Sequence, residues 1–193
     1  MKHVLIAAVA GCLAATPVFS QNNDTTEQTD AAAQADAAFP VAQTAPNTPE
    51  PAAVFGEWEQ RCVGEGDTEK CVLVQFGKTD EGEILSRLTI EALPEGAQAA
   101  AGLTIIAPLG VLLQAGMTLQ IDDGRLNRYP FAVCERDGCL AQFGLTATEV
   151  EVMKAGELMR LGIVGAGSQE PIMLNISLDQ FSEAWDALQA ASE

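Results

Sequence analysis

Residues 108–145 read PLGVLLQAGMTLQIDDGRLNRYPFAVCERDGCLAQFGL. Within this stretch, apolar Met117, Leu119 and Ile121 alternate with polar neighbours, which is the period of a half-buried strand. The Asp123-Gly124 pair that follows predicts a two-residue hairpin loop, because both residue types tolerate a positive φ. We therefore expect an antiparallel hairpin at the centre of this stretch.

The return strand is predicted to run from Arg125 towards Val133. Pro130 interrupts it, and proline has no N–H to donate to a neighbouring strand. This position therefore predicts an edge strand or a bulge.

Two cysteines, Cys134 and Cys139, follow the return strand. A two-residue turn at Asp137-Gly138 would pair Arg136 with Cys139 and leave the cysteines out of register. A four-residue loop instead places the cysteines directly opposite each other, close enough for a disulfide, and this register is our prediction. The charged tip of the loop, Glu135, Arg136 and Asp137, is the candidate recognition loop.

Cys62 and Cys71 form a second closely spaced pair. Four cysteines allow three pairings, and the spacing makes the local one, 62–71 with 134–139, the natural choice. A zinc site is the alternative, but the chain has neither CxxC spacing nor histidine near these residues. We therefore expect two disulfides and no metal site.

Residues 1–20 have the build of a secretory signal peptide. Lys2 precedes an apolar run over residues 4–15, and small residues precede a cut after Ser20. The run is too short to cross a bilayer, so we expect an exported chain with no transmembrane segment after signal removal. Lipidation at Cys12, within Val-Ala-Gly-Cys, is the less favoured alternative, because it leaves very short n- and h-regions.

Removing the signal takes away His3, the single histidine, and changes the formal charge from −17 to −18, with nine basic against 27 acidic residues. Catalysis by Ser-His-Asp or Cys-His groups needs a histidine, so we expect no enzyme, no catalytic residues and no cofactor. A strongly acidic chain is repelled by phosphate backbones, which excludes nucleic acid as an expected partner.

Residues 21–53 are rich in Ala, Gln, Thr and Pro, contain no Lys or Arg, and show no apolar period. Such a segment buries too little surface to offset its ordering entropy, so it is predicted to be a disordered acidic linker. The folded domain is predicted to span residues 54–190, a size that suits a single core.

Short alternating runs fill this domain, with turn signals about every ten residues. The run over 55–62 places Trp58 and Cys62 on one face. The other strand-like runs cover residues 71–76, 84–92, 103–107, 159–163 and 172–178. This order predicts an all-β fold of the β-sandwich type.

Two short helices are predicted, at about 146–155 and 178–190. Thr146 and Glu149 form a capping box before the first, and Gly156 ends it. The second is expected to follow Ser177. Its apolar residues recur at helical spacing and are predicted to pack in the core: Leu178, Phe181, Trp185 and Leu188.

Five segments, in order, resemble the invasion-associated locus B family: FGEWEQRC, CVLVQF, PLGVLLQAGMTLQIDDG, YPFAVCERDGCLA and ISLDQFSEAWDAL. The resemblance covers about residues 55–188. It implies an immunoglobulin-like β-sandwich located in the periplasm or at the outer membrane of a Gram-negative bacterium, with a role in host-cell entry for pathogenic members. Both cysteine pairs match family positions, and no catalytic residue is implied.

We therefore expect an exported, non-enzymatic interaction module of the cell envelope that acts in host-cell invasion by binding an envelope or host surface protein. The alternative is a periplasmic β-sandwich that supports the envelope by binding a small ligand or another envelope protein.

Overall fold

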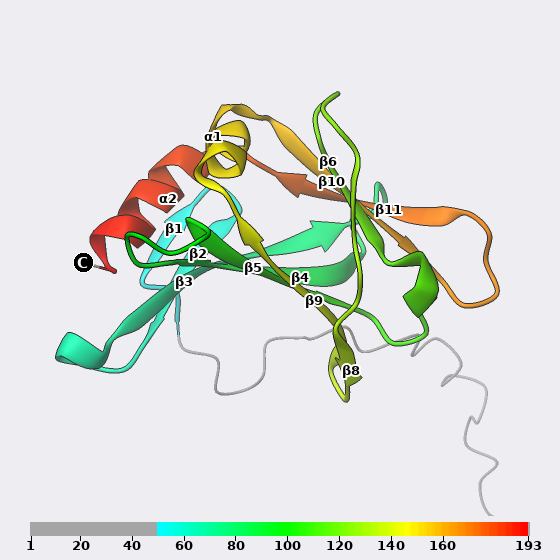
Figure 1. The fold of residues 1–193 in the computed structure, drawn as a ribbon, viewed down its shortest axis with the longest axis horizontal. Helices are drawn as coiled ribbons and strands as arrows, with labels where there is room; N and C mark the ends of the chain where they lie inside the picture. Colours follow the sequence, from blue (N-terminus) through cyan, green and yellow to red (C-terminus); the bar gives the residue numbers. More distant parts are fainter. Residues whose placement is uncertain (1–49, 193) are drawn as a thin grey trace, which may run out of the picture. The chain divides into compact units, whose positions relative to one another are not determined.

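The computed structural model describes residues 50–192, which form eleven antiparallel strands and two α-helices (Figure 1). The predicted signal peptide, its lipidation alternative at Cys12 and all but the last few residues of the predicted linker lie outside the described residues. Neither helix in the described part of the chain is long and apolar enough to cross a membrane.

The elements follow the chain in a simple order. The strands are β1 (Ala53–Phe55), β2 (Trp58–Val63), β3 (Lys70–Lys78), β4 (Ile84–Ala92), β5 (Ala101–Ala107), β6 (Met117–Ile121), β7 (Asn127–Tyr129), β8 (Val133–Glu135), β9 (Gly138–Leu145), β10 (Leu158–Val164) and β11 (Pro171–Ser177). The helices are α1 (Ala147–Ala155) and α2 (Phe181–Ala190), and single 3₁₀ turns lie at Gly66–Thr68 and Leu113–Ala115.

All strands belong to one sheet with the order β7-β6-β10-β11-β3-β4-β5-β9-β8, and the β1–β2 ribbon joins it at β3. β11 and β3 share only the pair Asn175 and Lys78, beside a break in register at Gly77. The sheet folds over at this weak link, and buried side chains from both of its halves form one core cluster. The predicted all-β, sandwich-like fold with two short helices is thereby confirmed.

The two ends of the sheet are joined to each other. β7 and β8 lie at opposite ends of the strand order, yet only residues 130–132 separate them in sequence. The Tyr129 ring of β7 stacks on the Phe143 ring of β9, with centroids 3.6 Å apart. Among the described strands β7 pairs with β6 alone, so the edge strand predicted from Pro130 is confirmed.

Helix α2 packs its apolar stripe into the core, as predicted. Phe181, Trp185 and Leu188 of the helix and Leu178 just before it are all buried, and full burial of one such side chain contributes about 1.5–3 kcal/mol. The Phe181 ring lies 5.0 Å from that of Trp58, whose Nε1 donates to the Ser177 carbonyl at 3.1 Å.

The predicted start of this second helix is wrong by three residues, because α2 begins at Phe181 rather than at residue 178. Ser177 is the last residue of β11, and its hydroxyl accepts a hydrogen bond from the Asp179 N–H at 3.2 Å. Gln180 has a φ of 57°, a left-handed conformation that an α-helix cannot contain.

The first predicted helix is confirmed, as are its capping box and the glycine that ends it. The Thr146 hydroxyl accepts from the Glu149 N–H at 3.2 Å, and the Glu149 carboxylate accepts from the Thr146 N–H at 2.8 Å. Gly156 follows the helix as its C-cap. The Lys154 ammonium of α1 lies 3.1 Å from the Asp186 carboxylate of α2, which links the two helices.

The run over residues 55–62 is not one strand, contrary to the prediction. Phe55 pairs with Trp58, so Gly56 and Glu57 form a two-residue turn between β1 and β2. Gly56 has a φ of 59°, which glycine adopts without steric cost. The alternation there belongs to two short strands.

The hairpin between β6 and β7 is confirmed, but its predicted two-residue loop is wrong. Leu119 pairs with Asn127, so the connection is longer. The Gly124 N–H donates to the Ile121 carbonyl at 2.8 Å, and Asp122 has a φ of 47°. The turn is therefore centred on Asp122 and Asp123, one residue before the predicted Asp123-Gly124 pair. The Asp122 carboxylate accepts the N–H of Leu158 at 3.0 Å, which holds Asp122 in this position.

Candidate functional site

Both predicted disulfides are present, between Cys62 and Cys71 and between Cys134 and Cys139. In each pair the cysteines lie directly opposite on neighbouring antiparallel strands. The ligand atoms of Cys62, Cys71 and Glu69 lie within 4.8 Å of one another. Both sulfurs are bonded in the disulfide, so neither can act as a thiolate ligand for a metal ion.

The candidate recognition loop is the tip of the β8–β9 hairpin. The predicted register is right, since Cys134 faces Cys139, but the predicted loop length is wrong. Glu135 also pairs with Gly138, which leaves Arg136 and Asp137 as a two-residue turn. Gly138 has a φ of 144°, and a Cβ there would collide with the Ala107 carbonyl. Ala107 ends β5, so this close approach of β9 to β5, like the positive φ at the end of the turn, requires a glycine.

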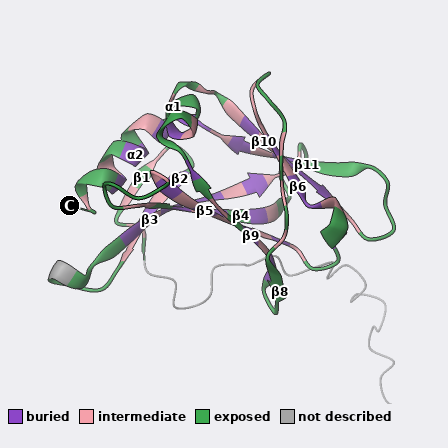
Figure 2. Cartoon of the chain, in the orientation of Figure 1, coloured by how far each residue is buried: buried purple, intermediate pink, exposed green. Residues whose placement is uncertain are grey.

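The three charged residues of the tip, Glu135, Arg136 and Asp137, are exposed to solvent, and Figure 2 shows the hairpin tip at β8 as exposed. No side chain in the described range 50–192 forms a hydrogen bond or an ion pair with any of them. The disulfide at the base of the tip fixes its backbone. The structure therefore presents a rigid charged tip whose side chains are available to a partner.

Sequence reasoning missed a pocket of about 300 Å³ that lies beside α1. Its walls come from six strands or turns and one helix: β5, β6, the β6–β7 turn, β7, β9, β10 and α1. A volume of this size is at the lower end of the range of small-molecule sites.

The pocket changes character from its floor to its mouth. The floor consists of five buried apolar residues: Leu103, Leu119, Leu145, Met153 and Met159. The mouth is more polar and more exposed, and its lining includes Gln120, Arg125, Asn127, Tyr129, Glu149 and Val152. Binding sites for organic ligands are built in this way, with an apolar interior and a few polar groups that set orientation.

Tyr129 forms one wall of the pocket and is held in place by its stack on Phe143. Burial raises the pKa of Tyr129, the Glu149 carboxylate raises it further, and the Arg125 guanidinium lowers it. Desolvation penalises the charged phenolate. The phenol therefore stays protonated at neutral pH and can donate a hydrogen bond into the pocket.

The two charged residues of the mouth differ in how they are paired. The Glu149 carboxylate is already held by the Thr146 N–H at 2.8 Å and by the Thr146 hydroxyl at 2.9 Å. Arg125 has no hydrogen bond or ion pair to any residue of the described part of the chain. Its guanidinium is therefore the charge at this mouth that remains open to a ligand.

Comparisons with known proteins agree on one family. A model of the family described as Invasion associated locus B (IalB) protein matches residues 58–189. Two invasion protein B homologs of Brucella abortus, from strain 2308 and from biovar 1 strain 9-941, are each 27% identical over 139 residues, covering 72% of this chain and 79% of the relative. The family match spans more than half of the chain.

A solved structure has the same fold. The crystal structure of invasion associated protein b from Bartonella henselae superposes with a TM-score of 0.62 at 20% identity, covering 72% of this chain and 95% of that chain. At this identity the likeness supports the fold alone, and it agrees with the curled antiparallel sheet described above.

Proposed function

Because the chain belongs to the invasion associated locus B (IalB) family, we propose that it is an exported, non-enzymatic binding module of the cell envelope that acts in host-cell invasion. The observation that carries this proposal is the pair of cross-strand disulfides. Disulfides persist in oxidising compartments and are rare in the cytosol, which supports export.

Action by binding, rather than by catalysis, is supported by the chemistry of the two candidate sites. The tip offers three exposed charges on a fixed backbone. The pocket offers apolar side chains, a protonated phenol, an arginine and a glutamate already engaged in a helix cap. Glu149, the carboxylate of the pocket, already accepts from the Thr146 N–H and hydroxyl, whereas the base of covalent catalysis must be directed at its nucleophile.

The partner proposed for the tip is an envelope or host surface protein. Exposed charges set orientation and association rate more than affinity, so neighbouring apolar surface is needed as well. Val133 of β8, 47% exposed, supplies some of it at the base of the tip.

Fractionation combined with surface proteolysis tests this function. We expect the protein in the cell envelope, and we expect added protease to digest it on intact cells, while a periplasmic marker stays protected. Recovery of the protein only in the soluble periplasm, with full protection on intact cells, would contradict a role at the host surface.

A second function, a periplasmic protein that supports the envelope by binding a small ligand, is favoured by one specific observation. The pocket beside α1 is lined by buried apolar residues and opens to solvent at Arg125. This observation sets the chemistry of the ligand, which is developed below.

A further inference from the structure

The pocket beside α1 combines two features that a packing defect in the core lacks. Its floor is formed by buried side chains such as Leu119 and Met153, so a ligand there would be removed from water on most sides. Its mouth is lined by the Tyr129 phenol, which is held by its stack on Phe143, and by the unpaired guanidinium of Arg125. A void left by imperfect packing has no such polar rim.

We propose that this pocket binds a single-chain amphiphile, with its alkyl tail on the apolar floor and its anionic head at Arg125. This inference deepens the binding role proposed above, and in particular the small-ligand form of that role, on which it rests. The occupant is defined by an apolar tail of limited length and by a carboxylate or phosphate head.

The volume limits the length of the tail. One molecule of liquid water occupies about 30 Å³, and a methylene group is of similar size. A pocket of about 300 Å³ therefore accepts a chain of roughly ten carbon atoms. Each buried methylene group adds to the affinity, so a tail of this length gives measurable binding even after the cost of association.

Charge selects the head group. The chain as a whole is strongly acidic, which disfavours anions in general, so a single open arginine at an apolar mouth is unusual here. The competing negative charge at the mouth is Glu149, whose carboxylate is held by Thr146 on the helix side. Arg125 belongs to a different element of the lining, the β6–β7 turn, and a guanidinium can donate two parallel hydrogen bonds to a carboxylate or phosphate.

The hairpin that carries Arg125 is fixed from both sides. The Gln120 side-chain N–H donates to the Gly124 carbonyl at 2.9 Å, which closes the turn next to Arg125. The Asp122 carboxylate accepts two backbone N–H groups at the start of β10, at 3.2 and 3.0 Å. The arginine is therefore presented from a fixed turn.

Calorimetric titration of the purified, disulfide-bonded protein with decanoate, decyl phosphate and decanol tests the proposal. We expect decanoate or decyl phosphate to bind wild-type protein more tightly than decanol, and the tighter of the two identifies the head group. Arg125→Gln should weaken the anionic probe about tenfold or more and change decanol binding less than threefold, because the tail contacts remain.

Arg136→Gln is the matched control, because it makes the same charge change at the exposed β8–β9 tip. It should leave all three affinities unchanged. A second variant, Val152→Phe, narrows the mouth at a residue that is 48% exposed, and it should weaken all three probes alike. The proposal is overturned if no probe binds wild-type protein up to its solubility limit, or if Arg125→Gln and Arg136→Gln weaken the anionic probe equally.

Tyr129 supplies an independent readout, since it is the single tyrosine of the chain. The phenolate absorbance in an alkaline titration therefore reports on the pocket alone, where burial raises the Tyr129 pKa most, Glu149 raises it further and Arg125 lowers it. An anionic head nearby should move the midpoint to higher pH, whereas decanol should move it less. These measurements use defined probes and purified protein, so their failure is distinct from failure of the envelope and surface experiment.

Discussion

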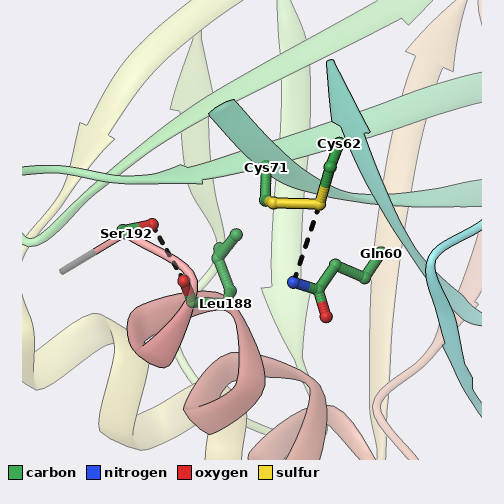
Figure 3. The surroundings of a disulfide bond; sticks show 5 residues. All are labelled: Gln60, Cys62, Cys71, Leu188 and Ser192. Carbon is green, nitrogen blue, oxygen red and sulfur yellow. Dashed lines mark hydrogen bonds between the residues drawn. A yellow bond between two sulfur atoms is a disulfide. The ribbon is translucent and has the colours of Figure 1, made fainter. Parts of the chain in front are cut away.

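The β2–β3 and β8–β9 hairpins are closed by the same cross-link but are packed differently. In both, directly opposite cysteines are bonded, and one cysteine of each pair, Cys71 and Cys139, is buried. The C-terminal residues Leu188 and Ser192 lie beside the first disulfide (Figure 3). The second leads outward to a strand, β8, whose three residues are all exposed.

This difference shows that the same bond serves two purposes in one sheet. The Cys62–Cys71 bond lies between a core strand and the helix that covers it, so it contributes to the stability of the domain. The Cys134–Cys139 bond fixes the shape of a surface tip that has little packing of its own. The following predictions test this division.

The largest effect is expected from Cys62→Ala with Cys71→Ala. The bond closes a ten-residue loop, and loop-closure entropy alone gives about 2.7 kcal/mol. Cys71 is 6% exposed and belongs to the core, so truncating its side chain adds about 1 kcal/mol. We expect the free energy of unfolding to fall by about 3–4 kcal/mol in urea denaturation monitored by tryptophan fluorescence.

A smaller loss is expected from Cys134→Ala with Cys139→Ala. This bond closes a six-residue loop, for which the same entropy relation gives about 2.2 kcal/mol. Cys139 is 2% exposed and, like Cys71, belongs to the core, so truncating its side chain adds about 1 kcal/mol. Because the tight turn and Gly138 already favour the hairpin without the bond, the measured loss should be about 2–3 kcal/mol, below that of the first pair. A loss equal to that of the first pair would contradict the division drawn between the two hairpins.

The difference between the hairpins also bears on what sequence could predict. Features whose partners are near in the chain were predicted correctly: the capping box of Thr146 and Glu149 and both disulfides. One error arose where a distant residue decides the local geometry. Asp122 shifts the β6–β7 turn because its carboxylate binds the Leu158 N–H, 36 residues away.

The two candidate sites also differ in how far apart their residues lie in the sequence. The charged tip is continuous in sequence, so its residues could be named in advance. The pocket joins Leu103, Arg125, Glu149 and Met159, which are spread over much of the domain. Each of them alone reads as a core or surface residue, and only the curl of the sheet brings them together.

Selective reduction provides a third test of the comparison. Thiol attack needs access to a sulfur. Cys134 is exposed, whereas Cys62 is half-buried and faces the Gln60 side chain (Figure 3). Under limiting reductant at neutral pH, the Cys134–Cys139 bond should open several-fold faster. Alkylation followed by peptide mass spectrometry measures the order, and faster opening of Cys62–Cys71 would show that the first hairpin is the less protected one.

The smallest effect on stability is expected at the tip itself. Replacing Glu135→Gln, Arg136→Gln and Asp137→Asn together removes three charges that form no hydrogen bond or ion pair with other described side chains. Exposed substitutions of this kind change the free energy of unfolding by less than about 0.5 kcal/mol.

Because the triple variant is expected to be as stable as wild type, a loss of binding can be assigned to recognition rather than to unfolding. If the rigid tip contacts a partner, the variant should lose capture of that partner from an envelope or host-surface extract while its urea midpoint stays at the wild-type value. The matched control is Glu81→Gln with Glu83→Gln, two exposed carboxylates in the β3–β4 loop. Equal capture by wild type and the triple variant would show that the tip does not bind the partner. The pocket beside α1 would then be the remaining candidate binding site.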